Sequence, residues 1–317
     1  MSESFEARSF VIKSEKVTDG AASKKDLHEP HESRHFTLEE RLGSGASSYV
    51  YAVCAGGRSW AAKFFRQEQG QTPEALQREA QILADLPRSP YLVDFEGYFS
   101  TELETSADLR EELKNEKEKH GKEPLEGDVK EEAKEAFYFL LMERCNCSLH
   151  SLIENSAFSE SEAAFATDAI LRGLAHLHSL RVVHRDVKDL NIMVADMGQK
   201  VCLGDFDLAT KIPVEEELIE WKGGTRGYMA PEVCSQRQGG FKADLFSAGV
   251  VLHLLLTRSN PFLPSEGSQG PLDWHIVRLF RSESSCKLMY SLLEEDPKLR
   301  PTAEEALDFE WVAGGEA

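Results

Sequence analysis

The chain has 317 residues, of which 41% are hydrophobic and 29% are charged, and its formal net charge is −19. This composition is typical of a soluble protein with a sizeable core, and the length allows one large domain or two lobes that share a cleft. Nucleic-acid binding needs clustered Lys and Arg to neutralise phosphates, so the acidic balance argues against a nucleic-acid partner.

Cysteine usage and apolar segments bear on the compartment. Six cysteines are too few for a disulfide framework, and the spacing of Cys145 and Cys147 is wrong for a zinc site. The N-terminus lacks the apolar stretch of a signal peptide, and the most apolar segment, residues 245–256, is shorter than the about 20 residues of a membrane span. We expect reduced thiols, no membrane partner and a cytoplasmic or nuclear location.

The first ordered segment is expected near residue 35. Residues 1–34 are polar and have little periodicity, which predicts a disordered tail, unless residues 10–12 dock on the domain. Two strand-like segments, residues 36–42 and 49–53, then flank a Gly/Ser turn. Glycines in such a turn let backbone N–H groups approach phosphates, although Gly/Ser hairpins are also common without a ligand.

Residues 60–65 predict an apolar strand that carries Lys63. Taken alone, a lysine in such a strand is more often a snorkelling or edge residue than a ligand. Thr72-Pro73 then predicts a helix start, and Glu79 lies on the following helix. Taken alone, Glu79 would be a solvated side chain.

A charged insertion is predicted at residues 101–135, which are rich in Glu and Lys and have no apolar stripe. It is either a docking site for partner proteins or a solvated spacer. The apolar strand that follows, residues 137–142, ends at Glu143.

A long amphipathic helix, residues 160–180, leads to the run HRDVKDLN at residues 184–191, which apolar strand-like segments flank. The Asp of this run can accept a hydroxyl proton, the Lys can reach a phosphoryl group, and the Asn offers an amide oxygen to a hard cation. These are the parts that phosphoryl transfer needs.

These segments resemble the eukaryotic protein kinase family over residues 36–312. The run at residues 184–191 is similar to the kinase catalytic loop, GDFD at 204–207 to the D-F-G element, and APE at 230–232 to the end of the activation segment. Residues 43–50 resemble the Gly-rich loop, and all of these occur in family order.

The resemblance implies an α+β fold: a bilobal kinase domain with a small antiparallel β lobe containing one helix and a larger, mainly helical lobe. The implied kinase domain spans residues 35–312, with the small lobe at 35–143 and the large lobe at 146–312. Residues 313–317 would form a C-terminal tail.

The resemblance also implies ATP and Mg²⁺ as cofactors and assigns site residues. The implied catalytic residues are Lys63, Glu79, Asp186, Lys188 and Thr225. The implied metal ligands are Asn191 and Asp205. The implied nucleotide-binding residues are Leu42, Gly43, Ser44, Gly45, Val50, Ala61, Lys63, Glu143 and Cys145.

In the roles implied, Lys63 contacts the α- and β-phosphates and Glu79 orients it, while Asp186 accepts or orients the substrate hydroxyl. Lys188 would stabilise the migrating phosphoryl group, and Thr225 would bridge Asp186 and Lys188. The function implied is a kinase that phosphorylates serine or threonine hydroxyls of proteins; the alternative is a nucleotide-binding pseudokinase or scaffold.

The sequence departs from the family pattern at three positions. Ser48 replaces the third glycine of the Gly-rich loop, Asp207 replaces the glycine of D-F-G, and Asp189 replaces a proline, which we interpret as the mildest change. A further hypothesis concerns Arg185, which in this family commonly receives a phosphorylated residue. A glutamate from the acidic segment 215–220 would take the place of that phosphate, unless the segment is only solvated.

Overall fold

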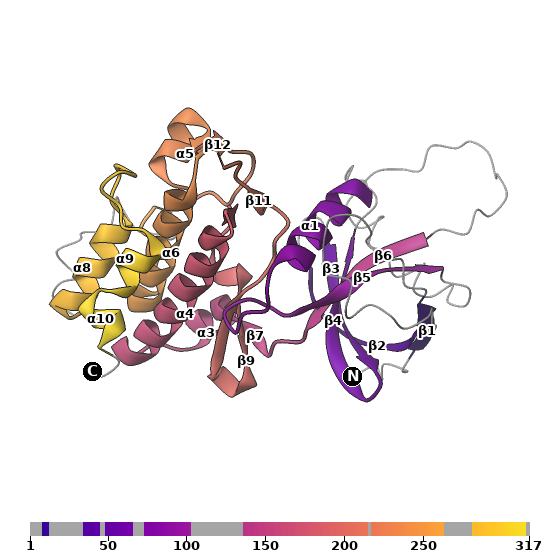
Figure 1. Ribbon diagram of the computed structural model, residues 1–317. Coiled ribbons are helices and arrows are strands. Elements are labelled where there is room, and N and C mark those ends of the chain that lie inside the picture. Colours follow the sequence, from indigo (N-terminus) through magenta and orange to yellow (C-terminus); the bar gives the residue numbers. More distant parts are fainter. Residues whose placement is uncertain are drawn as a thin grey trace, which may run out of the picture. The chain divides into compact units, whose positions relative to one another are not determined.

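The structure is a computed structural model (Figure 1) that describes residues 8–12, 34–44, 48–65, 73–102, 136–214, 217–262 and 281–314. The chain divides into two compact units. We call them the sheet unit, which comprises Met1–Ala80 with Phe95–Arg144, and the helical unit, which comprises Gln81–Asp94 with Cys145–Ala317. The expected α+β class, with an antiparallel sheet in one part and helices in the other, is confirmed.

The sheet unit is built on one six-stranded antiparallel sheet with the order β1-β2-β3-β4-β6-β5. Its strands are β1 (Arg8–Ile12), β2 (Arg34–Ser44), β3 (Ser48–Ala55), β4 (Arg58–Phe65), β5 (Phe95–Glu102) and β6 (Ala136–Glu143). Gly56 and Gly57 join β3 to β4 with φ values of 58° and 75°, which favour glycine in a tight hairpin turn. Helix α1 (Pro73–Asp85) begins in this unit.

Aromatic side chains fill one face of this sheet. Phe139 lies at the centre, with its ring centroid 5.0 Å from that of Phe64 and 5.5 Å from that of Phe99. Tyr51 packs edge-on against Phe64, and Phe36 edge-on against Phe139. Because side chains alternate along a strand, the residues between these aromatic side chains point to the opposite face.

The sequence predicts a disordered N-terminal tail and a charged insertion, and the structure describes part of the tail but not the residues of the insertion after β5. Arg8–Ile12, which belongs to the predicted disordered tail, forms β1 and pairs antiparallel with Arg34–Leu38 of β2. The tail thus supplies a strand because an open sheet edge offers its backbone hydrogen bonds. The predicted insertion falls between β5 and β6, and its residues 103–135 lie outside the described residues.

The helical unit contains α3 (Leu149–Asn155), α4 (Glu160–Ser179), α5 (Pro231–Gln236), α6 (Phe241–Thr257), α8 (Glu283–Leu292), α9 (Ala303–Leu307) and α10 (Glu310–Ala313). The expected long helix is α4, which a capping box of Ser159 and Glu162 starts. Helix α6 is buried over nearly its whole length, so the other elements pack around it. None of the described helices combines the length and the apolar character that crossing a membrane requires.

Short strands hold the loops of this unit in place. β7 (Cys147–Ser148), β9 (Ile192–Ala195) and β10 (Lys200–Leu203) form one small sheet. β8 (Val182–Val183) pairs with β11 (Thr210–Lys211), and β12 (Ile219–Glu220) pairs with β13 (Gln238–Gly239). The run at residues 184–191 therefore starts directly after β8 and ends directly before β9.

Candidate active site

Lys63 and Glu79 form a buried ion pair in the sheet unit. The Lys63 Nζ lies 3.0 Å from Oε1 and 3.3 Å from Oε2 of Glu79, and the two residues are only 4% and 3% exposed. A charge this far from water must be paired or neutralised. Lys63 is therefore not a snorkelling residue. Glu79 is not a solvated side chain on the surface of a helix.

The strand register gathers several implied nucleotide-binding residues on one face of the sheet. Gly43 of β2 lies opposite Val50 of β3, and Val50 lies opposite Lys63 of β4. Ala61, two residues before Lys63, points the same way. Val50, Ala61 and Lys63 thus share the face that the aromatic cluster does not use.

The remaining nucleotide-binding predictions are distributed as follows. Leu42 and Ser44 belong to β2, and Glu143 ends β6 opposite Trp60. Cys145 belongs to the helical unit, two residues before β7. Gly45 lies outside the described residues.

Asp186 lies at the centre of a hydrogen-bond cluster in the helical unit. The Lys188 Nζ donates to its Oδ2 at 2.6 Å, and the Thr225 hydroxyl donates to its Oδ1 at 2.7 Å. Lys188 also donates to the Thr225 Oγ1 at 2.9 Å. Asn191 uses its Nδ2 to reach the Asp186 carbonyl at 2.9 Å and the Oδ2 at 3.0 Å. Four of the predicted residues are therefore in one cluster.

Oxygen ligands for a hard cation come from Asn191 and the loop after β10. The Nδ2 of Asn191 donates to Asp186, which leaves its Oδ1 as the side-chain atom that could hold a metal. The backbone N–H of Gly204 donates to the Asn191 carbonyl at 2.8 Å, which ties the residue before Asp205 to Asn191. Carboxylate oxygens of Asp205 and Asp207 lie within 4.8 Å of each other. This donor set of amide and carboxylate oxygens fits Mg²⁺.

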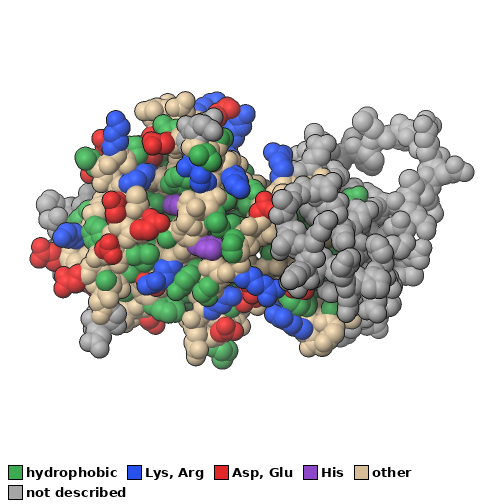
Figure 2. Space-filling model, in the orientation of Figure 1, with side chains coloured by type: hydrophobic (Ala, Val, Ile, Leu, Met, Phe, Trp, Pro, Cys, Tyr) green, Lys and Arg blue, Asp and Glu red, His purple; other side chains and the backbone are tan. Residues whose placement is uncertain are grey.

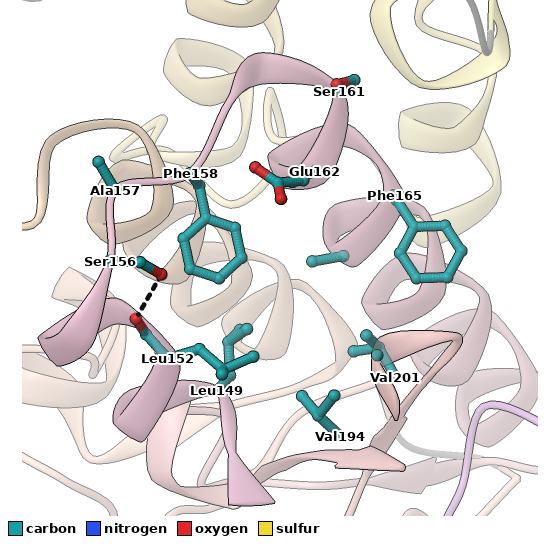
Figure 3. Close-up of a pocket in the computed structure, with 12 residues that line it drawn as sticks. Leu149, Leu152, Ser156, Ala157, Phe158, Ser161, Glu162, Phe165, Val194 and Val201 are labelled. Atoms are coloured by element: carbon teal, nitrogen blue, oxygen red, sulfur yellow. Dashed lines mark hydrogen bonds between the residues drawn. The ribbon is translucent and has the colours of Figure 1, made fainter. Parts of the chain in front are cut away.

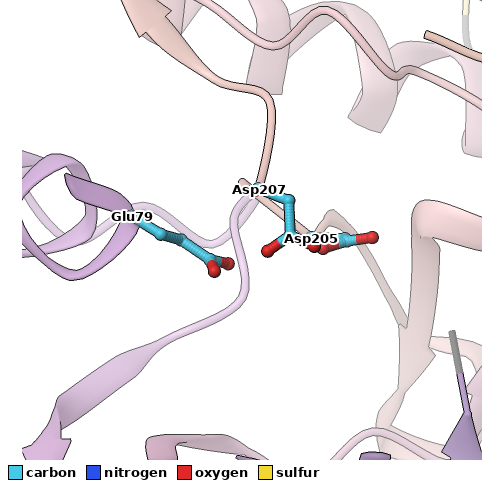
Figure 4. A group of neighbouring side chains, drawn as sticks. All are labelled: Glu79, Asp205 and Asp207. Carbon is cyan, nitrogen blue, oxygen red and sulfur yellow. The ribbon is translucent and has the colours of Figure 1, made fainter. Parts of the chain in front are cut away.

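Figure 4 draws Asp205 and Asp207 on the loop after β10, together with Glu79 from α1 of the sheet unit. Asp205 has a φ of 58°, a left-handed conformation that is uncommon for a residue with a side chain. Asp207, which stands at the position of the glycine in the D-F-G pattern, brings a second carboxylate to this loop. Asp205 stays the predicted metal ligand, and the Asp207 carboxylate lies beside it.

Asp244, near the start of α6, accepts hydrogen bonds from the backbone of the catalytic loop. Its Oδ2 accepts from the His184 backbone N–H at 2.8 Å, and its Oδ1 accepts from that of Arg185 at 2.9 Å. His178 Nε2 lies 3.0 Å from Oδ2. Burial raises the pKa of Asp244, but the His178 hydrogen bond and nearby positive charge outweigh it, so the pKa lies below the ordinary value.

His184 connects the catalytic loop to the D-F-G-like element. Its Nε2 lies 3.0 Å from the Gly204 carbonyl, which can only accept, so Nε2 carries the proton. The ring centroid is 5.1 Å from that of Phe206, a side chain with 2% exposure. These contacts place the loop of Asp205 against the loop of Asp186.

The side chain of Arg185 meets neutral partners. It donates to the Lys222 carbonyl and to the Thr210 hydroxyl at 3.5 Å, and its Cζ lies 5.2 Å from the centroid of the Trp221 ring. Burial lowers the pKa of Arg185, although the Asp244 charge acts in the opposite direction. Glu220 pairs with Lys222 at 3.1 Å instead. Residues 215–216 of the acidic segment lie outside the described residues.

One network was missed at the level of the sequence. Asp189 is 4% exposed and binds Tyr228 and His150, each at 2.6 Å. The replacement of a proline by Asp was the only signal, and it was interpreted as mild. Neither partner is near in sequence, so spacing alone could not have revealed the network.

An apolar pocket of about 400 Å³ lies elsewhere in the helical unit (Figure 3). It opens between α3, the start of α4 and the β9–β10 hairpin, and side chains such as Leu152, Phe158 and Phe165 line it. Glu162 is its one charged lining residue. None of the predicted catalytic or metal-binding residues lines this pocket.

Comparisons with known proteins bear on the family of the chain. Residues 36–312 match the family model described as protein kinase domain. A mouse protein, serine/threonine-protein kinase DCLK3, is 34% identical over 194 residues, which cover 56% of this chain and 24% of the relative.

Two further relatives are similar to about the same degree. Calcium/calmodulin-dependent protein kinase cmkA of Emericella nidulans is 31% identical over 59% of this chain and 48% of its own length. Human CaM kinase-like vesicle-associated protein is 30% identical over 58% of this chain and 40% of its own length. The chain thus spans less than half the length of each of these relatives. Its match over residues 36–312 shows that the chain belongs to the eukaryotic protein kinase family, of the serine/threonine type.

Proposed function

We propose that the chain is an active kinase that transfers the γ-phosphoryl group of ATP to serine or threonine hydroxyls of proteins. The observation that carries the proposal is the cluster in which Asp186 receives hydrogen bonds from Lys188, Thr225 and Asn191. Phosphoryl transfer is mostly positioning and electrostatics, so pre-set side chains are what it requires.

The nucleotide would lie on the sheet face that Val50, Ala61 and Lys63 share. The Lys63 ammonium would contact phosphate oxygens, and Glu79 would hold it in one direction through the bidentate contact. A buried lysine without this carboxylate would lose its fixed position and its charge compensation.

Asp186 would orient the acceptor hydroxyl and take its proton. Lys188, at 2.6 Å from the Asp186 carboxylate, would reach the phosphoryl group in transfer. Thr225 would hold Asp186 and Lys188 in fixed positions relative to each other, because its hydroxyl contacts both side chains. Asn191 and Asp205 would hold Mg²⁺, with Asp207 adjacent; the bound ion neutralises phosphate charge.

A phosphorylation assay with labelled ATP, Mg²⁺ and a serine/threonine peptide library tests the proposal. The Asp186→Asn variant keeps the size of the side chain but removes the proton acceptor, so we expect kcat to fall by about 100-fold or more. Asp308→Asn, which changes an exposed carboxylate beyond α9, is the matched control and should keep wild-type activity.

The alternative is a pseudokinase or scaffold, which the replacements Ser48 and Asp207 keep open. Wild-type protein that binds Mg²⁺-ATP, as seen in a thermal shift, but labels no peptide would favour this alternative. Labelling that survives Asp186→Asn would also contradict the proposed mechanism.

A further inference from the structure

Asp189 is a buried carboxylate inside the catalytic loop. Its Oδ1 accepts from the Tyr228 hydroxyl at 2.6 Å, and its Oδ2 lies 2.6 Å from His150 Nδ1. A carboxylate with 4% exposure is costly unless its oxygens are hydrogen-bonded, and here each oxygen has a partner. The arrangement is therefore a built network and not a chance surface contact.

Two hydrogen bonds, called ties below, join the catalytic loop at residues 184–191 to the segment at residues 225–228, and the contact of Asp189 with Tyr228 is the second of them. The first is the bond from Thr225 to Asp186 at 2.7 Å, and the second lies three residues further on in each segment. The Tyr228 N–H donates to the Thr225 carbonyl at 3.1 Å, so both ties belong to one turn. A single tie leaves a pivot, whereas two ties fix both the position and the direction of Thr225.

Tyr228 is itself anchored to α6. The Ser247 hydroxyl donates to the Tyr228 carbonyl at 2.8 Å, one helical turn after Asp244. Asp244 holds the backbone at the start of the catalytic loop. One rigid helix thus supports both segments that the Asp189–Tyr228 bond joins.

The second partner of Asp189 is His150 of α3. Its Nδ1 lies by Asp189 and its Nε2 lies 3.3 Å from Glu154 Oε1. Carboxylates only accept hydrogen bonds, so the His150 ring nitrogen that faces Asp189 is the donor in this contact. Burial, followed by the bond to Asp189, raises the pKa of Tyr228, which keeps the phenol a donor.

We propose that Asp189 is a positioning residue for phosphoryl transfer: by binding the Tyr228 hydroxyl, it holds Thr225 in contact with Asp186 and Lys188. The inference rests on the proposed kinase activity and deepens it. It assigns a role to a residue that replaces the proline of the family pattern, and proline has no side-chain acceptor.

Tyr228→Phe, Asp189→Ala and the double variant test the proposal. Each single variant should lower kcat by about 10- to 100-fold, the size expected for a lost hydrogen bond to a charged group, and the KM for ATP should stay within about 2-fold. The fall in kcat of the double variant should be no larger than that of the more impaired single variant, because both changes remove the same interaction. Tyr91→Phe, which alters a tyrosine ring that lies under Arg172, is the matched control.

Hydrogen exchange of the peptide at residues 222–230 gives a readout that needs no catalysis. It should speed up in Tyr228→Phe and Asp189→Ala and stay at the wild-type rate in Tyr91→Phe. If the wild type labels no substrate, the proposed function fails, while exchange still reports on the tie. A folded Tyr228→Phe variant with wild-type kcat would overturn the proposal, and so would losses that multiply in the double variant.

Discussion

Arg300 has 1% of its surface exposed, and its guanidinium is bound on every side. It contacts both carboxylate oxygens of Glu232 at 2.8 and 3.1 Å and donates to the carbonyls of Lys242 and Glu294. Its Cζ lies 5.1 Å from the centroid of the Phe246 ring. The planar, forked guanidinium is suited to this set of acceptors, which an ammonium cannot match.

Replacing this guanidinium should destabilise the fold. For Arg300→Lys, we expect the free energy of unfolding to fall by about 3 kcal/mol, because Glu232 is left buried with an incomplete partner. Urea unfolding measures this loss. Arg172→Lys is the matched control, since that arginine pairs with Asp168 on the surface, and its effect should stay below about 1 kcal/mol. Equal losses in the two variants would contradict the argument.

At this scale, contacts within motifs were predictable and contacts between distant residues were not. The pair Lys63–Glu79 follows from motif order. Asp189 is 39 residues from His150 and 39 from Tyr228, and the sequence around Asp189 does not indicate either contact. The same holds for Trp221, whose ring lies against the Arg185 guanidinium although the two residues are far apart in the sequence.

Helix α6 is the element on which the loops of the helical unit depend. Its first turns supply Asp244 to the catalytic loop and Ser247 to the segment of Tyr228. Because the helix is buried almost throughout, its position is fixed by packing and not by the loops that it holds.

The lowered pKa of Asp244 predicts an acid-linked loss of stability. A carboxyl whose pKa is lower in the folded than in the unfolded state stabilises the fold above its unfolded pKa of about 3.9. That contribution disappears as the pH falls through the folded pKa. Asp244→Asn should therefore lower the free energy of unfolding by about 3 kcal/mol at pH 7, since the amide turns an N–H₂ toward a backbone N–H.

Urea unfolding at a series of pH values checks this prediction. The difference between wild type and Asp244→Asn should shrink in acid, and Asp308→Asn should track the wild type. A difference that stays constant down to the lowest pH would show that the Asp244 charge is not what supports the loop.

The β12–β13 pair positions Trp221 against Arg185. Gly239 of β13 lies so close to the indole that a Cβ there would be 2.5 Å from Trp221 Cε3 and 2.9 Å from Val233 Cγ2. Gly239→Ala must therefore displace the ring, at a cost of about 1–3 kcal/mol in the free energy of unfolding. Combining it with Trp221→Phe should lessen the loss, because the smaller ring leaves room. Tryptophan fluorescence and urea unfolding measure the two effects.

Among the elements, long periodic segments were predictable and two-residue pairings were not. The helix expected at residues 160–180 is Glu160–Ser179, because its apolar face and capping box act locally. The pairs β8–β11 and β12–β13 are too short to leave a pattern and depend on the surrounding packing. β1 likewise depends on the presence of β2.

The net charge of the whole molecule bears on its encounters with substrates. The chain carries a formal charge of −19, although acidic and basic side chains of the helical unit are interspersed on the face that Figure 2 shows. A diffuse negative field should speed the approach of cationic peptides, and salt should screen it.

We therefore expect kcat/KM for a lysine-rich peptide to fall several-fold as salt rises from about 0.05 to about 0.5 M. A serine peptide of zero net charge is the control and should show little change. Initial rates at low peptide concentration measure both. Equal salt dependence for the two peptides would contradict long-range steering.

On the scale of the whole chain, motif order predicted the α+β class and a small sheet part followed by a helical part. It also predicted Lys63 in the first part and Asp186 in the second. Lys63 belongs to the sheet unit and Asp186 to the helical unit, which also contains Gln81–Asp94 of the predicted small lobe. The unusual backbone at Asp205 and the full set of supports for the catalytic loop required coordinates, since they arise from tertiary packing.

Strand β1 covers the outer side of β2 and so shields its backbone N–H and C=O groups. A shortened form that starts at Arg34 would present that side of β2 to other molecules. An exposed strand of this kind is a template for edge-to-edge association, so such a form should be more prone to aggregate than the full chain.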